Sequence, residues 1–301
     1  MNHTRIHIDG LLEHCAFPPP GTSLDCAVSG GADSLALLVL GVAAGCRVCA
    51  HHVDHGLRPG SGAEADVVAA AAERFGTGFA AHQVEVDRGP NLEARARAAR
   101  YGVLPEGVST GHTADDQAET LLLALLWGSA WPGLSAMEPG PRRPILRLRR
   151  ADTESLCERL GLDPVVDPSN TDPVHRRNRV RHELLPLLDE IGQRDTVPVL
   201  ARQADLFRQG GEVLAELAAA LDPTDAKALS AAPEVLARQA VRDWLRSGRD
   251  DEHPPDLATV DRVLAVARVE SRGTDVGRGW RVERSAQRLR LVAPTDQQTD
   301  D

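Results

Sequence analysis

The chain has 301 residues, of which 42% are hydrophobic and 26% are charged. These values are typical of a globular protein, and the length predicts a sizeable core and two domains. Aromatic residues make up only 3% of the chain, which argues against the base-stacking surfaces of single-strand-binding proteins. The N-terminal segment lacks the pattern of a signal peptide, and no apolar run is long enough to span a bilayer. We therefore expect a cytoplasmic protein with no membrane contact.

The net charge of −10 at pH 7 is unevenly distributed along the chain. Residues 1–141 carry 8 basic and 16 acidic side chains, residues 142–182 carry 10 and 6, and residues 183–301 carry 16 and 22. The net charges of these three segments are −8, +4 and −6. The basic segment 142–182 is therefore where we expect contacts with the phosphates of a nucleic acid.

The five cysteines are an odd number, which indicates a reducing compartment and no disulfide framework. Cys46 and Cys49 form a C-x-x-C pattern that three histidines follow closely. This pattern could be half of a zinc site or a redox pair. However, the chain has no second C-x-x-C, and an extended strand would place the two cysteines on opposite faces. We interpret them as buried strand cysteines.

Strand and helix patterns alternate over the first part of the chain. We expect a lead-in helix at 5–15, strands at 24–28, 47–53, 79–86 and 107–110, and helices at 33–44, 63–75, 91–101 and 114–127. This alternation predicts an α/β fold with a doubly wound parallel sheet. Ligands of such sheets bind beyond the carboxyl ends of the strands, where the motifs described below are placed.

The pattern changes beyond residue 142. Helices are expected at 152–160, from 177 to a stop near Pro186, and at 197–221, 232–247 and 256–269, before a hairpin over 280–292 and a disordered tail, 294–301. We therefore predict a first domain over 1–192, a linker helix over 193–221, and a smaller, mainly helical C-terminal domain over 222–293.

The segment Ser29-Gly30-Gly31-Ala32-Asp33-Ser34 joins the first strand to its helix. Two glycines let backbone N–H groups turn inward, and a helix N-terminus attracts anions, so the loop is suited to phosphate. A carboxylate at Asp33 beside phosphate implies Mg²⁺ between them. The alternative is a glycine turn capped by Asp and Ser, which any α/β protein can contain.

This loop has neither the Walker pattern nor the G-x-G-x-x-G pattern. It resembles instead the phosphate loop of the ATP-pyrophosphatase (PP-loop) superfamily. Members of that superfamily cleave ATP between the α- and β-phosphates and adenylate an oxygen of the substrate.

Three acids, Asp115, Asp116 and Glu119, follow His112 at the start of an apolar helix. A capping arrangement with Thr113 at the helix N-terminus explains one of these three acids. Asp115 and Glu119 lie at i,i+4 and repel each other, so the cluster favours Mg²⁺ or an ammonium group as a ligand. For His112, a role in capping the turn is an equally good interpretation.

Two sets of arginines could contact phosphates. Arg97 and Arg100 share one helix face, and Arg176, Arg177, Arg179 and Arg181 lie within six residues. Each set could be a solvated surface. In an otherwise acidic chain, we favour contact of the second set with RNA or a triphosphate.

Taken together, these motifs resemble the tRNA(Ile)-lysidine synthetase family. The resemblance rests on the loop at 29–34, on His52-Val53-Asp54-His55-Gly56-Leu57-Arg58, on 96–101, on 111–120, on Asp167-Pro168-Ser169-Asn170, and on 177–181. It covers residues 22–188 and continues more loosely through 293. It implies an adenine nucleotide alpha hydrolase-like fold, in a short form that lacks a further C-terminal domain.

The resemblance implies ligation of free L-lysine to carbon 2 of the wobble cytidine of tRNA(Ile) with the CAU anticodon, through an adenylated cytidine. ATP and Mg²⁺ are the implied cofactors, with Mg²⁺ at Asp33, and a homodimer is among the assemblies considered. The implied catalytic residues are Asp33, Asp116 and Arg97. ATP would bind Ser29, Gly30, Gly31, Ala32, Asp33, Ser34, His52 and Asp54, lysine would bind His112, Asp115, Asp116 and Glu119, and tRNA would bind Arg100, Arg176, Arg177, Arg179 and Arg181.

The chain departs from the family pattern at two places. The segment between Tyr101 and Gly111 is short, which suggests a trimmed helix, and Trp127 replaces a typical arginine. Two other functions stay open. One is a PP-loop tRNA thiolase, and the other is a non-catalytic nucleotide-binding protein associated with RNA.

Overall fold

The computed structural model describes residues 2–54, 56, 62–84, 92–167, 170, 172–249 and 255–294. The chain divides into two compact units, residues 1–207 and 208–301, and each is described by itself. The disorder predicted for residues 295–301 and part of the second motif, His55 and Leu57-Arg58, lie outside the described residues.

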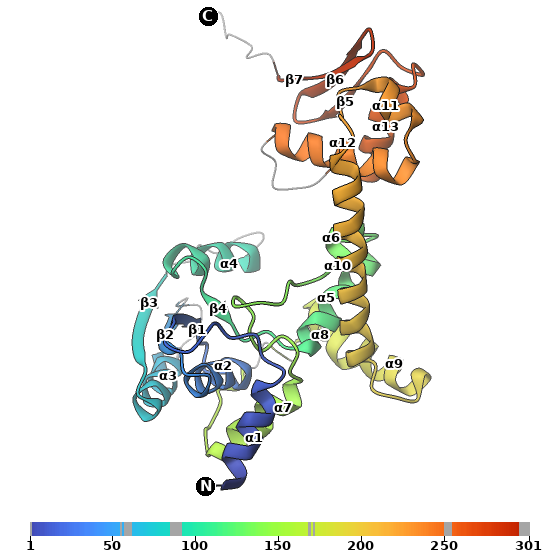
Figure 1. The fold of residues 1–301 in the computed structure, drawn as a ribbon. Helices are drawn as coiled ribbons and strands as arrows, with labels where there is room; N and C mark the ends of the chain where they lie inside the picture. The colour runs from blue at the N-terminus through green and yellow to red at the C-terminus, as the bar shows by residue number, and fades with distance from the viewer. Residues whose placement is uncertain are drawn as a thin grey trace, which may run out of the picture. The chain divides into compact units, whose positions relative to one another are not determined.

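The first unit is built on a four-stranded parallel sheet with the strand order β3-β2-β1-β4 (Figure 1). Its strands are β1 (Ser23–Ala27), β2 (Arg47–Asp54), β3 (Gly78–Gln83) and β4 (Ser109–Thr110). The predicted parallel α/β fold is confirmed. Because β2 and β4 pair with opposite edges of β1, the order reverses between β1 and β4, and the crevice beyond these strand ends is the expected ligand site.

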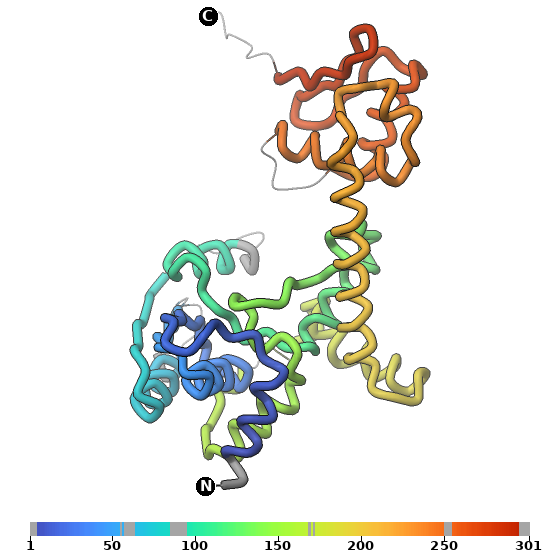
Figure 2. Tube along the Cα trace, in the orientation of Figure 1, coloured from blue at the N-terminus to red at the C-terminus, as the bar shows by residue number. Residues whose placement is uncertain are grey.

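Helices lie on both sides of this sheet. Figure 1 shows α2 (Ala32–Ala43) and α3 (Gly62–Phe75) against one face and α4 (Leu92–Val103) on the other side. Residues 34–41 of α2 are all buried. This helix is apolar almost all round because the sheet packs on one side of it and α7 (Arg150–Leu160) packs on the other. Figure 2 shows α7 beside α1 (Asn2–Leu12), although the two are far apart in sequence.

The helices after β4 are α5 (Ala114–Leu126), α6 (Trp131–Leu134), α7, α8 (Arg176–Arg179), a π-helical turn (Val180–Leu184), α9 (Leu185–Gly192) and α10 (Val197–Ala219). The predicted stop near Pro186 is wrong, because the chain stays helical to Gly192. Pro186 is the second residue of α9, directly after the π-helical turn, so the helical segment continues through it.

The second unit has its own hydrophobic core. Its elements are α11 (Ala226–Ala231), α12 (Glu234–Arg249), α13 (Leu257–Ala267), β5 (Gly273–Gly277), β6 (Trp280–Ser285) and β7 (Arg288–Val292). The core contains Leu229, Leu245, Leu264, Val282 and Leu289. Instead of the predicted hairpin, the structure has a three-stranded antiparallel sheet, β5-β6-β7. Strand β5 was missed because it begins and ends with glycine and buries only Val276.

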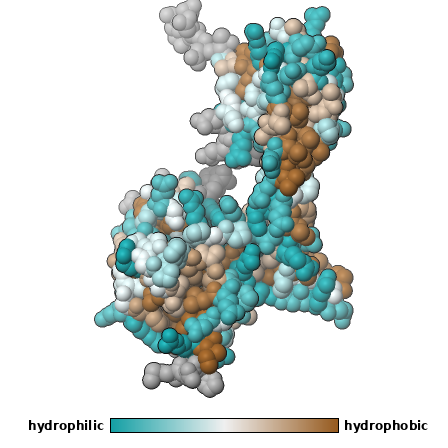
Figure 3. Space-filling view, in the orientation of Figure 1, coloured by the Kyte–Doolittle hydropathy of each residue, from teal (hydrophilic) through white to brown (hydrophobic). Residues whose placement is uncertain are grey.

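In the view of Figure 3, each unit shows both hydrophilic areas and hydrophobic patches on its visible face. Among the described helices, none is both long and apolar enough to cross a bilayer.

The end of β4 lies against the first turn of α2 at Gly111. A Cβ atom at this position would lie 2.7 Å from the carbonyl oxygen of Asp33 and 3.0 Å from the Cα atom of Ser34. Since both atoms are backbone, they cannot rotate away. Gly111 therefore allows the loop after β4 to approach the loop after β1.

We expect Gly111→Ala to lower the free energy of unfolding by about 1–3 kcal/mol, because it forces two backbone segments apart. Urea unfolding would measure this change. The matched control is Gly102→Ala, where nothing lies within 4 Å of the added Cβ atom. An equal loss of stability in both variants would contradict the close approach at Gly111.

Candidate active site

An open cavity of about 1290 Å³ lies in the first unit, beyond the carboxyl ends of β1, β2 and β4. Its wall contains residues of several predicted motifs: Ser29, Gly31, Ala32, Asp33, Ser34, His52, Arg97, Arg100, His112, Asp116 and Arg181. The fold therefore brings residues that are up to 152 positions apart to one cavity. Asp54, Asp115, Glu119 and Arg177 are not part of this wall.

The loop after β1 is held closed by one of its own side chains. The backbone N–H of Ser29 donates to Ser34 Oγ at 3.1 Å, and this hydroxyl donates to the carbonyl oxygen of Gly31 at 2.9 Å. Gly30 has a φ of +90°, and a Cβ there would lie 3.1 Å from a methyl group of Val165. Gly31, the N-cap of α2, provides no side-chain cap. The first N–H groups of this helix therefore suit an anion in the cavity.

His52 presents a buried nitrogen that has no partner. Its side chain is 2% exposed and lines the cavity. Nδ1 lies 3.0 Å from the carbonyl oxygen of Val28, whereas Nε2 has no hydrogen-bond partner among the described residues. This nitrogen is therefore a candidate contact for a ligand in the cavity. Asp54, at the end of β2, accepts a hydrogen bond from the N–H of Gly56 at 2.8 Å.

Asp33 has too little positive charge around it to offset its burial. The Thr153 hydroxyl donates to one carboxylate oxygen, and Arg150 Nε lies 3.5 Å from the other. Burial raises the pKa of Asp33 to about 6, although Thr153 and Arg150 act in the opposite direction. A cation in the cavity would favour the charged form, so this carboxylate suits Mg²⁺.

Arginines of the basic segment neutralise the acids of α5. Glu119 is fully buried, and its carboxylate accepts from Arg177 Nε at 2.6 Å and from Arg181 Nε at 2.7 Å. Asp116 lies 3.2 Å from Nη2 of Arg150 and 3.2 Å from Nη2 of Arg177. The acid cluster was expected to require Mg²⁺ or an ammonium group. The structure corrects this argument, because guanidinium groups already supply the charge.

Asp115 connects α5 to the start of α7. Arg149 binds both oxygens of its carboxylate at 3.1 Å, and the backbone N–H of Arg150 donates to it at 2.8 Å. We did not single out Arg149, Arg150 or Thr153 from the sequence. Two adjacent arginines at the start of a helix are unfavourable for the helix dipole. This pattern in the sequence could have identified Arg149 and Arg150 as candidate site residues.

His112 and Asp116 differ in charge although both line the cavity. Burial lowers the pKa of His112 to about 4, so the imidazole is neutral at pH 7, and Nδ1 lies 2.7 Å from the Thr110 hydroxyl. Burial alone would raise the pKa of Asp116, but Arg150 and Arg177 hold it below its ordinary value. The backbone N–H of Thr113 also donates to Asp116 at 2.9 Å, which confirms the predicted helix cap.

The arginines predicted to meet RNA differ in their surroundings. Arg177 and Arg181 turn inward to Glu119, whereas Arg176 and Arg179 are exposed. The guanidinium of Arg176 lies 5.8 Å from the ring centre of Trp127, and Arg179 pairs with Glu183. A uniform cationic face is therefore not formed by these four side chains. On α4, Arg97 lies 5.1 Å from the ring centre of Tyr101.

The chain is similar to several known proteins. A PP-loop domain family matches residues 5–188. A tRNA(Ile)-lysidine synthase from Nocardia farcinica is 41% identical over 286 residues, which cover 89% of this chain and 89% of that protein. One from Rhodococcus erythropolis is 43% identical over 238 residues, or 74% of this chain and 73% of that protein. The solved structure of a U34-tRNA thiolase from Methanococcus maripaludis has a TM-score of 0.51 at 15% identity, over 69% of this chain and 79% of that chain, a likeness of fold alone.

We expect Glu119→Gln to lower the free energy of unfolding by about 3 kcal/mol, because it removes the buried carboxylate that Arg177 and Arg181 share and leaves them only Asp116 as an anionic partner among the described residues. Chemical denaturation would measure the change. The control is Glu183→Gln, which removes an exposed partner of Arg179 and should leave stability unchanged. If Glu119→Gln is as stable as the control variant, the carboxylate does not anchor these arginines.

We expect Asp33→Asn to be more stable than the unsubstituted chain at neutral pH. The pKa of Asp33 is raised to about 6 in the folded state, against about 3.9 when unfolded. Between about pH 4 and pH 6 the folded state binds more protons at this site, so rising pH lowers stability. The advantage of Asp33→Asn should be absent near pH 4 and reach about 2–3 kcal/mol above pH 6. Urea unfolding at several pH values without divalent cations tests this, and a constant difference would contradict it.

Proposed function

Because the chain belongs to the tRNA(Ile)-lysidine synthase family of PP-loop proteins, we propose that it ligates free lysine to carbon 2 of the wobble cytidine of tRNA(Ile) with the CAU anticodon. ATP is converted to AMP and pyrophosphate in this reaction. The observation that carries the proposal is a single cavity that combines the loop at 29–34 with a neutral His112 and an ionised Asp116.

In the first step, the loop would hold the β- and γ-phosphates of ATP. His52 Nε2, which has no hydrogen-bond partner within the described part of the chain, would be available to the nucleotide. The O2 atom of cytidine attacks the α-phosphorus, the bond to the bridging oxygen breaks, and pyrophosphate leaves. Mg²⁺ held by Asp33 would neutralise phosphate charge when bound. The protein's contribution is mainly position and charge, and Arg97, which lines the cavity, would contribute positive charge to the phosphates.

In the second step, the lysine ε-ammonium group releases a proton to solvent and the amine attacks carbon 2. The bond between carbon 2 and the adenylated oxygen then breaks, and AMP leaves with that oxygen. The ordinary pKa of this amine is about 10.4, so neutralising it at pH 7 costs about 4–5 kcal/mol. We propose that Asp116 binds the ammonium group, because it is the one acid of α5 in the described cavity wall and its pKa is held low. A carboxylate of low pKa is a good cation ligand and a weak base.

The other predicted lysine ligands have different places in this proposal. His112 lines the cavity beside Asp116 and can accept or donate a hydrogen bond as a neutral imidazole. Asp115 and Glu119 act through the arginines that they bind, since neither lies in the cavity wall. They would therefore position Asp116 and its surrounding charge rather than touch lysine.

We propose that tRNA contacts Arg100 in the cavity wall and the exposed Arg176 and Arg179, and that the second unit binds the body of the tRNA. Arg177 and Arg181 support this surface from within through Glu119. A cytoplasmic location and a homodimer are further parts of the proposal. The domain limits at residues 192 and 221 also stay predictions.

We expect the purified chain to incorporate radiolabelled lysine into a CAU-anticodon tRNA(Ile) transcript when ATP is present. Asp33→Ala should reduce both pyrophosphate release and lysine incorporation by at least about 100-fold, because the loop loses its only carboxylate. The exposed Asp9 of α1 provides a control, and Asp9→Ala should keep both activities.

Failure of the unsubstituted chain to incorporate lysine, with ATP binding retained, would overturn the synthase proposal in favour of a non-catalytic nucleotide-binding protein. Incorporation that persists in Asp33→Ala would remove Asp33 from the mechanism.

A further inference from the structure

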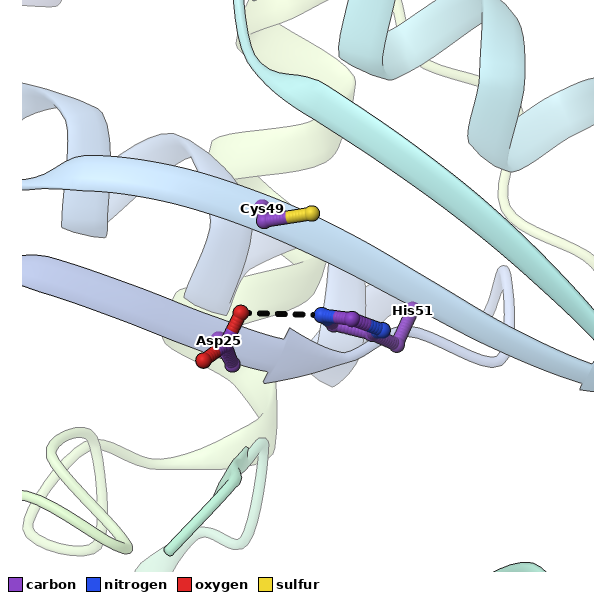
Figure 4. Close-up of side chains that lie close together, drawn as sticks. All are labelled: Asp25, Cys49 and His51. Carbon is purple, nitrogen blue, oxygen red and sulfur yellow. Dashed lines mark hydrogen bonds and ion pairs between the residues drawn. The ribbon is translucent and has the colours of Figure 1, made fainter. Parts of the chain in front are cut away.

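The face of the sheet opposite the main core carries a group of side chains of metal-binding types, which lies outside the loop at 29–34. Asp25 of β1 is paired in register with Cys49 of β2, and His51 follows two residues later on the same face. One ligand atom of each residue lies within 4.8 Å of those of the other two. Figure 4 shows the three side chains together, with His51 Nε2 hydrogen-bonded to Asp25 Oδ1 at 2.9 Å.

From this placement we propose that Asp25, Cys49 and His51 form a binding site for a divalent transition metal, with zinc as the best match. Carboxylate, thiolate and imidazole are the three ligand types that zinc uses in proteins. Their two negative charges match the charge of the ion. Closing the group to zinc–ligand distances requires side-chain movements of about 1 Å. Three protein ligands leave a fourth position for water.

A residue of the neighbouring strand orients His51. Nε2 of His82, on β3, lies 3.0 Å from Nδ1 of His51, and the two rings stack with their centres 5.3 Å apart. His51 thus directs one nitrogen to His82 and the other to the proposed metal. Metal-binding histidines in proteins commonly have such an outer partner, which holds the ring and selects the tautomer.

A glycine on the neighbouring strand leaves space for the thiol of Cys49. Gly78 of β3 is its partner in register, and a Cβ atom on Gly78 would lie 3.1 Å from Cys49 Sγ. On the exposed side, the Asp25 side chain is 42% accessible, which provides a path for an ion. Cys46, the other member of the C-x-x-C, packs in the main core and donates to the carbonyl oxygen of Pro18. The two cysteines therefore point to different faces, and only Cys49 belongs to the site.

The proposed ion would bridge β1 and β2 directly before the loop at 29–34. The backbone N–H of Val28 already donates to the carbonyl oxygen of His51 at 2.8 Å. A metal bridge would replace the hydrogen bond between His51 and Asp25 with a link through the ion, and would so strengthen the attachment of His51 to the strand that precedes the loop at 29–34. Its predicted effect is on stability, independent of the proposed ligation reaction.

We expect the full chain, stripped with a chelator, to bind one Co²⁺ per molecule and to show the near-ultraviolet charge-transfer band of a cobalt–thiolate bond. Cys49→Ser should abolish this band, and Asp25→Asn and His51→Gln should each weaken binding at least about 10-fold. His82→Ala should weaken Zn²⁺ binding about 10–100-fold. Zn²⁺ should raise the melting temperature of the unsubstituted chain but not that of Cys49→Ser.

The matched control is Cys15→Ser, since Cys15 is also a half-buried free cysteine but lies outside the group. It should keep the cobalt–thiolate band. Melting curves recorded in chelator establish that each variant folds before metal is added. Absence of the band in the folded, unsubstituted chain would overturn the proposal. So would a band that survives in folded Cys49→Ser, because another cysteine would then be the ligand.

Discussion

The carboxylate of Glu119 lies fully buried in α5, and the surrounding first unit is arranged to satisfy it. An ionised carboxylate removed from water is costly unless cations and hydrogen-bond donors replace the water. Arg177 and Arg181 provide both, so the segment from α8 through the π-helical turn must fold back onto α5. The basic segment is therefore part of the interior architecture as well as a source of surface charge.

Arg150 extends this network to the phosphate loop. Its guanidinium lies within 3.5 Å of carboxylate oxygens of Asp33, Asp116 and Glu119. One side chain thus links the loop after β1 with the helix after β4. Any ligand that brings its own charge into this cavity changes the balance around Asp33, the acid whose pKa is raised. We therefore expect the pKa of Asp33 to depend on whether a charged ligand occupies this cavity.

The two faces of the sheet have different chemistry. Leu24, Cys26 and Val48 belong to the apolar core beneath α2. The alternate residues Asp25 and Cys49 face the other side. A parallel strand buried on both faces would be apolar throughout. The polar residues on the second face therefore require an explanation other than core packing, and a metal ion is our proposal.

The sequence by itself determined the parallel α/β class, the position of the loop at 29–34 and the cap of α5, because strand periodicity, adjacent glycines and capping residues act locally. It also identified part of the cavity lining, including Asp33, His112 and Asp116, but not Arg150. The local sequence pattern could not predict that the helical segment continues past Pro186, and it could not reveal β5. Both features depend on tertiary packing. The tertiary structure alone decided which acids reach the cavity and which arginines are paired. Glu119 and Arg181 are 62 residues apart, and a charge pair over that separation depends on the whole fold.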